Sequence, residues 1–285
     1  MKSDGHIALE SARSIPVLRA PKRKAQRYVP LKLRRSGLSL LLGGGSIVLL
    51  LALWELASRT GMVNPKFASS PSRVFMTGVE MFKGGEIWRH IYASGKIFFA
   101  GYLLSVAVGI PAGILLGWFA RARMAFAPIV AAMYTTPRIA LMPLFIIWFG
   151  LGIGSKMALV FMSAVFPIIV NMQMAMRSVD NDLTKVAKAY GANRRQIFFT
   201  IALPMSVPFL MTALQLATGR ALLGVVGAEV FGGSEGLGYL IQYTGATFQT
   251  DKVFVCVTII AALGIAMDRI LMALSRRFDA WRGID

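Results

Sequence analysis

Residues 157–176 read MALVFMSAVFPIIVNMQMAM, a run of 20 residues without a charged side chain. Because about 20 helical residues cover the roughly 30 Å of hydrocarbon in a bilayer, this run predicts a transmembrane helix. The chain contains five more apolar stretches of comparable length, at residues 38–57, 97–119, 133–150, 205–230 and 253–275. The sequence therefore predicts an all-α polytopic membrane protein with six transmembrane helices.

The composition fits this class of protein. Of the 285 residues, 56% are hydrophobic and 15% are charged, whereas a soluble domain carries about 25% charged residues. The net charge is nevertheless +18, so basic segments must alternate with apolar ones. The one cysteine, Cys256, and the two histidines, His6 and His90, indicate neither a disulfide nor a metal site. We expect no metal, no cofactor, no nucleic-acid partner and no catalytic activity.

The distribution of Lys and Arg predicts the orientation of the spans. With the N-terminus inside, the inner segments hold 20 basic residues and are 1–37, 120–132, 177–204 and 276–285. The outer segments hold 8 and are 58–96, 151–156 and 231–252. Because cytoplasmic loops carry the excess of Lys and Arg, both termini are expected in the cytoplasm.

The basic tail 1–37 is too long and too charged for a cleaved signal peptide, so we expect span 38–57 to be an uncleaved signal anchor. The tail clusters Lys22, Arg23, Lys24 and Arg27. Such a cluster is expected to lie against anionic lipid of the inner leaflet.

The outer loop 58–96 contains the segment PSRVFMTGVEMFKGG, in which apolar side chains recur at helical spacing. These are Val74, Phe75, Val79 and Phe82. The segment predicts an amphipathic helix, which either lies along the outer membrane face or packs on the spans.

The chain lacks an energy source of its own. No G-x-x-x-x-G-K-[ST] phosphate loop occurs in it. The spans show no internal repeat of the kind found in secondary transporters, and Asp268 lies near the inner end of its span rather than at mid-membrane. Energy must therefore come from another polypeptide, or the chain is a passive channel or a membrane scaffold without transport.

The inner segment 177–204 reads RSVDNDLTKVAKAYGANRRQIFFTIALP. Apolar side chains recur at helical spacing and predict a helix from Asn181 to Tyr190. They are Leu183, Val186, Ala187 and Tyr190. Asp180 or Asn181 is suited to begin this helix and Gly191 to end it. A second helical stretch is expected to kink or restart at Pro204. The apolar stripe predicts insertion into a groove of a partner protein, or a position flat on the lipid surface.

The same segment resembles the cytoplasmic E-A-A-x3-G-x9-I-x-L-P motif in permease subunits of binding-protein-dependent ABC importers. The residues at the matching positions are Ala187, Gly191, Ile201, Leu203 and Pro204. The chain departs from the motif at Lys185, which replaces Glu, and at Val186, which replaces Ala. The resemblance implies that the ATPase-coupling residues are Lys185, Val186, Ala187, Tyr190, Gly191, Ile201, Leu203 and Pro204.

The resemblance covers about residues 67–275. Its segments are FASSPSRVF, GIPAGILLGW, TTPRIALMPLFIIWFGLG, ALPMSVPFLMTAL and GAEVFGGSEGLGYLI. They are similar to the nitrate/sulfonate/taurine branch of these permeases. The implied fold is that of a type I ABC importer permease, with residues 97–275 as the permease core and 177–204 as its coupling loop.

The resemblance also implies the partners and the cargo. The partners are a second copy of the permease, two ATP-binding cassette ATPase subunits and a periplasmic substrate-binding protein, in a bacterial inner membrane. The cargo is a small, usually anionic solute such as nitrate, taurine or an alkanesulfonate. Relatives also import thiamine-precursor pyrimidines and aromatic acids.

Three charged residues inside the spans are candidates for the transport pathway. Arg138 lies between Pro137 and Pro143 and either lines a cavity or extends to the cytoplasmic interface. Arg220 lies deeper, as a pathway charge or a buried structural one. Glu229 comes nine residues later, about 180° away on a straight helix, so the two pair only across a helix break or with other helices.

The segment GGSEGLGYL follows Glu229 directly and contains Gly236 and Gly238. Its glycines favour a re-entrant or gating turn, and the alternative is a plain exposed loop. We include both glycines among the pathway candidates.

Overall fold

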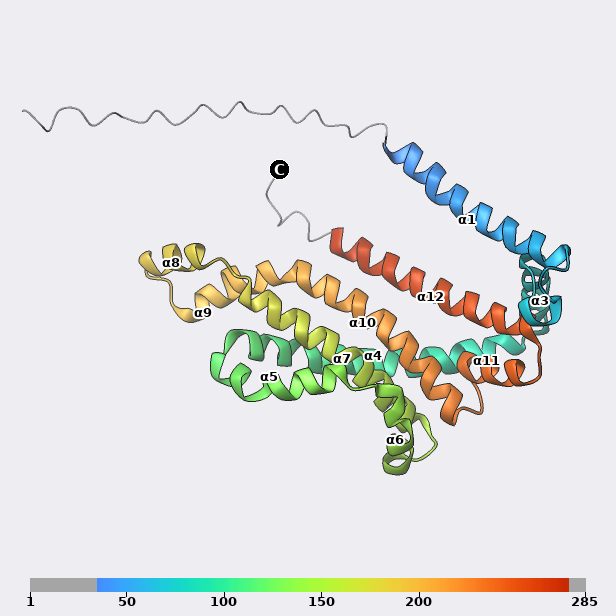
Figure 1. Ribbon diagram of the computed structural model, residues 1–285. Helices are drawn as coiled ribbons and strands as arrows, with labels where there is room; N and C mark the ends of the chain where they lie inside the picture. Colours follow the sequence, from blue (N-terminus) through green and yellow to red (C-terminus); the bar gives the residue numbers. More distant parts are fainter. Residues whose placement is uncertain (1–34, 277–285) are drawn as a thin grey trace, which may run out of the picture. The chain divides into compact units, whose positions relative to one another are not determined.

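The computed structural model describes residues 35–276, and all regular elements within that range are helices (Figure 1). They are α1 (Arg35–Arg59), α2 (Pro65–Ala68), α3 (Pro71–Gly84), α4 (Glu86–Trp118), α5 (Ala120–Thr135), the 3-10 helix η1 (Arg138–Leu141), α6 (Met142–Phe149), α7 (Ile153–Arg177), α8 (Asn181–Ala189), α9 (Arg194–Ile197), the π-helix η2 (Phe198–Ala202), α10 (Leu203–Gly232), α11 (Leu237–Ala246) and α12 (Thr250–Arg276).

By its internal contacts the chain divides into Met1–Leu50 and Leu51–Asp285. The first unit contains the N-terminal part of α1, and the packing described below belongs to the second. The clustered cations of the predicted basic tail, and the C-terminus from residue 277, lie outside the described residues.

Within the described range, five helical stretches are long and apolar enough to cross a membrane, and a bent pair raises the number to six. The five are Leu42–Arg59, Glu86–Trp118, Ile153–Arg177, Arg194–Gly232 and Thr250–Arg276. The pair is Ala120–Thr135 with Arg138–Phe149, bent by 93°. The predicted all-α fold with six spans is confirmed.

Two elements differ from the sequence prediction. Helix α4 begins at Glu86, well before the predicted span 97–119, because Gly85 (φ +78°) ends α3 and the chain turns directly into the next helix. The predicted inner loop 120–132 is helical, and the predicted span 133–150 is broken: Thr136 is extended, as the residue before Pro137 prefers.

The packing partners show that the bent pair makes one crossing. Helices α4 and α7 run parallel, with Gly101 against Val160 at one end and Gly117 against Met176 at the other. The chain that joins the end of α4 to the start of α7 must therefore return across the bundle. Helix α5 packs against Phe166 of α7, and α6 packs against Leu159, nearer the start of α7. Together α5 and α6 therefore form a broken span.

Small residues hold α4 against α7. Ser105 lies in a row on α4, spaced four residues apart, with the glycines at 101, 109, 113 and 117. A Cβ at any of these glycines would fall within 3.0 Å of an α7 side chain. Such rows let helices approach closely in lipid, where apolar burial gives little driving force. Helix α10 packs on α7, with Gly224 against Ser163, and also contacts α4, where the Tyr102 hydroxyl donates to the Leu214 carbonyl (3.1 Å).

Helices α3, α11 and α12 complete the second unit. Helix α12 runs antiparallel to α10, and Gln215 donates to Asp268 between them (3.0 Å). Helix α3 confirms the predicted amphipathic helix and packs on the spans through Gly78 and Val255. Its outer face leaves Phe75 73% exposed, so this apolar face remains available to lipid.

Candidate functional site

The segment between α7 and α10 begins with a short capped helix. Asp180 accepts a hydrogen bond from the amide of Asp182 (2.7 Å) and caps α8, which agrees with the predicted helix. Gly191 ends it with φ +85°, a conformation that costs a residue with a Cβ about 1 kcal/mol or more. Asn193 and Gln196 then form a reciprocal capping box that starts α9.

The apolar face of α8 is not covered by the described part of the chain. Leu183 is 48% exposed, Val186 54% and Tyr190 90%. Behind this face, a pocket of about 310 Å³ lies between Ala187 and Ile201. Since exposed apolar side chains at this density mark an interaction surface, α8 requires a partner or lipid to bury them.

Lys185 occupies the position at which the motif has Glu. Its ammonium group pairs with Asp182 (2.9 Å), one turn earlier on α8, and both side chains are exposed. A pair of this kind contributes about 0–1 kcal/mol. Lys185 therefore leaves the apolar face unobstructed while reversing the charge beside it.

A short turn at residues 190–193 joins α8 to a continuous helical stretch that leads into the core. From Arg194 the chain passes through the π-helix η2 into α10, and the whole stretch to Gly232 spans 39 residues. The predicted kink before Pro204 is therefore a π segment and not a break. Ile201 and Leu203 are half-buried there, and Ala202 is fully buried.

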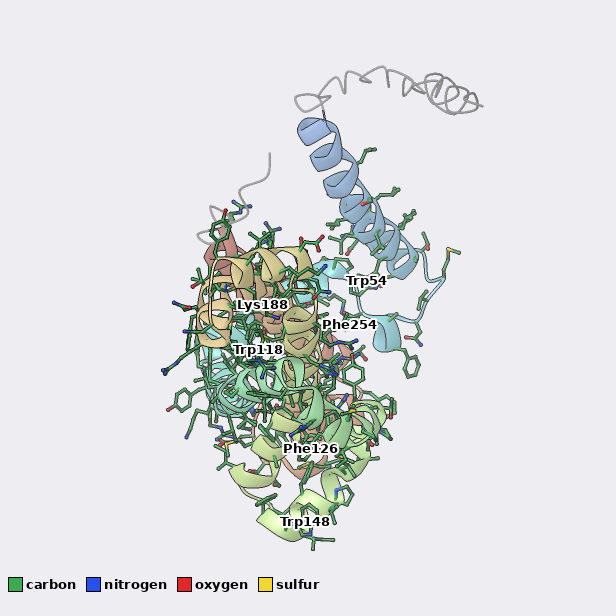
Figure 2. All side chains as sticks on the ribbon, turned by 90° about the vertical axis from the view of Figure 1, so that its left-hand side faces the viewer. Trp54, Trp118, Phe126, Trp148, Lys188 and Phe254 are labelled. Atoms are coloured by element: carbon green, nitrogen blue, oxygen red, sulfur yellow. The ribbon has the colours of Figure 1, made fainter. Side chains whose placement is uncertain are left out.

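Helix α8 lies at the end of the bundle where α4 and α7 finish (Figure 1). In Figure 2 this end faces the viewer, with Lys188 on α8 and Trp118 at the end of α4. The cations at this end are Arg121, Arg123, Arg177, Lys185, Lys188, Arg194, Arg195 and Arg276.

At the far end of α10, Glu229 is fully buried and hydrogen-bonded. Its carboxylate accepts from the Ser94 hydroxyl of α4 (2.7 Å) and from the amide of Gly238 on α11 (2.7 Å). Ser94 in turn accepts from the amide of Leu237 (2.8 Å), and the His90 Nδ1 accepts from the amide of Gly236 (3.1 Å). We call Glu229, Ser94, His90 and the amides of residues 236–238 the latch.

The glycines of the latch are required by its geometry. Gly236 has φ +116°, and a Cβ on it would collide with the Glu229 carboxylate. A Cβ on Gly238 would fall 2.9 Å from Glu229 Cβ and 2.7 Å from the Val226 carbonyl oxygen. The chain therefore folds back onto α10 at residues 236–238, which are buried, and does not form a plain exposed loop there.

Arg138 and Arg220 lie on different elements, η1 and α10, and neither takes part in the latch. The Arg138 guanidinium donates to the Tyr134 carbonyl (2.6 Å), at the end of α5, and lies over the Tyr134 ring. Arg220 is exposed on α10. Glu229 directs its carboxylate to Ser94 and Gly238, whereas the hydrogen bonds of Arg138 are to α5, so the three candidates have separate surroundings.

Ser94 and His90 were not predicted as site residues. Both fall inside the predicted outer loop 58–96, because the polar start of α4 lowers the hydropathy there. Their spacing of four residues, on one face of a helix, is the signal that could have joined them to the site.

The sequence and the fold of this chain are similar to those of known proteins. A family model described as "Binding-protein-dependent transport system inner membrane component" matches residues 109–280. The chain is 32% identical over 233 residues to SsuC of Bacillus subtilis (strain 168), named for aliphatic sulfonates transport, covering 82% of this chain and 84% of that protein. It is 29% identical over 244 residues to the taurine transport permease TauC of Escherichia coli K12, covering 84% and 89%.

Two further proteins are similar. The formylaminopyrimidine transport permease ThiX of Halalkalibacterium halodurans is 30% identical over 235 residues, covering 82% of this chain and 93% of that protein. An inward-facing structure of the MetNI methionine ABC transporter covers 66% of this chain and 97% of its own, with a TM-score of 0.54 and 22% identity, which shows the fold alone. This chain belongs to the family of inner-membrane permease components of binding-protein-dependent ATP-driven importers, in its nitrate/sulfonate/taurine-type branch.

Proposed function

We propose that this permease forms a homodimer, couples to two ATPase subunits through α8, and admits a small anionic solute from a periplasmic binding protein. The observation that carries the coupling proposal is the uncovered apolar face of α8, with Tyr190 90% exposed, one short turn before a continuous helix that runs from Arg194 into α10. A helix that presents such a stripe fits a groove in a partner.

The proposed orientation places α8 in the cytoplasm, with both termini inside. The distribution of Lys and Arg along the whole sequence supports this, with 20 in the segments assigned to this side and 8 in those assigned to the other, since Lys and Arg are enriched on the cytoplasmic side. The latch then lies toward the periplasmic side of α10. Movement of α8 on its ATPase would reach the latch through α9, the π-helix and α10.

The proposed cargo is a sulfonate. Two relatives at 29–32% identity are named for sulfonate and taurine transport, and each of these solutes carries a negatively charged sulfonate group. Arg138 on η1 and Arg220 on α10 each place a positive charge within a predicted span, and a positive charge in a low-dielectric passage attracts an anion. A formylaminopyrimidine is the second candidate cargo, because ThiX is similar over the same part of the chain.

Uptake into vesicles tests the function. The permease is reconstituted with its ATPase and binding protein, and ATP-dependent uptake of taurine, an alkanesulfonate and a formylaminopyrimidine is compared. Preferential uptake of the sulfonates supports the proposal. Uptake of the pyrimidine alone, or uptake that does not depend on ATP, contradicts it.

A further inference from the structure

An apolar groove of about 510 Å³ runs along the last turns of α4, beside α9 and η2. Its wall contains Ile114 and Leu115 deeper in the span, and Trp118, Phe119 and Phe199 toward the α8 end. Leu115, Phe119 and Phe199 are each about half exposed, at 48%, 47% and 56%. From residue 111 to residue 118 the groove extends about 10 Å along α4.

Two cations border this groove. Arg194 and Arg195 open α9, line the groove, and are exposed. Within residues 35–276 neither guanidinium forms an ion pair with a carboxylate. The nearby Arg123 differs, because it donates to the Gly117 carbonyl (3.1 Å) and so caps α4. Arg194 and Arg195 therefore remain available for an external anion.

We propose that this groove binds an anionic phospholipid. The phosphate of the headgroup lies between Arg194 and Arg195, and one acyl chain follows the wall of the groove along Leu115 and Ile114. Guanidinium groups form strong charge-assisted hydrogen bonds with phosphate. Trp118 and Phe119 suit the boundary between headgroup and hydrocarbon, where aromatic side chains gather.

The arrangement favours a lipid over a protein partner. A water-soluble protein that docks at the α8 end would have to insert about 10 Å into the hydrocarbon to fill the groove along α4. A lipid supplies both required chemistries, one anionic group at the boundary and one apolar chain within the bilayer. The bound lipid would contact both α4 and α9 and would thus stabilise the segment that joins α8 to α10. This consequence alone rests on the proposed coupling role of α8.

Fluorescence quenching of Trp118 tests the proposal in the full chain. Trp54, Trp88, Trp148 and Trp281 are replaced by Phe, which leaves Trp118 as the single fluorophore. The protein is reconstituted in mixtures of phosphatidylglycerol and phosphatidylcholine, in which one or the other carries brominated acyl chains. Relative quenching then gives the preference of the groove for the anionic lipid. We expect a preference of about fivefold or more, the effect of at least one basic side chain near an anionic surface.

Paired variants separate this site from general charge effects. Arg194→Gln with Arg195→Gln should bring the preference close to one. Arg177→Gln with Arg276→Gln removes the same charge from exposed positions at the same end and should leave the preference unchanged. No preference in the parent protein, or a preference that survives the first pair, overturns the proposal. Unquenched Trp118 in both lipids would mean that protein, such as a second copy, fills the groove, and also overturns it.

Discussion

Removal of the Ser94 hydroxyl is expected to weaken the attachment of α11 to the latch. Ser94→Ala deletes the donor to Glu229 and the acceptor for the Leu237 amide, both in buried surroundings. A hydrogen bond to a charged group contributes about 1.5–3 kcal/mol, and a buried donor left without a partner costs about 1–3 kcal/mol. The two losses together predict that local opening of α11 becomes easier by roughly 2.5–6 kcal/mol.

Cys256 is a natural reporter of this opening. It is the one cysteine in the sequence, is fully buried, and packs with Ile87, Leu237 and Leu240. A maleimide reaches its thiol only when α11 separates from α12. Because every 1.4 kcal/mol is a factor of about 10 in an equilibrium constant, a loss of about 2.5 kcal/mol raises the labelling rate about 60-fold.

The matched control is Ser163→Ala. Ser163 is also buried, but its hydroxyl bonds only to the Leu159 carbonyl of its own helix. This variant should label within about fivefold of the parent rate, since a typical internal hydrogen bond contributes about 1 kcal/mol. Labelling of Ser94→Ala at the parent rate, in protein that inserts normally, would refute the latch.

Three other substitutions test separate parts of the structure. Gly113→Ala should sharply reduce the yield of folded protein after detergent extraction, because the new Cβ would meet the Ile169 carbonyl of α7. Gly95→Ala, whose Cβ would have no atom within 4 Å, should leave this yield unchanged. Gly191→Ala should lower ATP-driven uptake, whereas Gly85→Ala, with the same strain of about 1 kcal/mol and equally open space, should not. Arg220→Gln should reduce uptake of a sulfonate more than that of a neutral solute while assembly is retained; equal uptake of both at the parent level excludes Arg220 from the pathway.

Local pattern predicted the helices well, and for a physical reason. Apolar runs of span length and the stripe on residues 181–190 are properties of contiguous sequence. The extended backbone of Thr136 is likewise a local property, because the residue before a proline disfavours the helical conformation. Whether the chain then bends by 93° or ends depends on packing against α7, which no local pattern contains.

The latch shows where local reasoning fails. Ser94 and Glu229 are 135 residues apart in sequence, so their contact requires the fold. The glycines at 236 and 238 indicated a tight turn, but only the structure reveals that the turn closes on a buried carboxylate. The row of small residues on α4 was visible in sequence, and its partner α7 was not.

A photo-crosslinker at position 190 measures whether α8 docks on the ATPase. The side chain is 90% exposed, so p-benzoylphenylalanine at this position should not disturb the fold. Tyr92, 68% exposed near the start of α4, is the control position at the opposite end. Docking of α8 on the ATPase predicts a crosslink to the ATPase subunit from position 190 and none to that subunit from position 92. In an assembled complex, a crosslink to the ATPase from position 92, or crosslinks to lipid alone from position 190, would refute docking by α8.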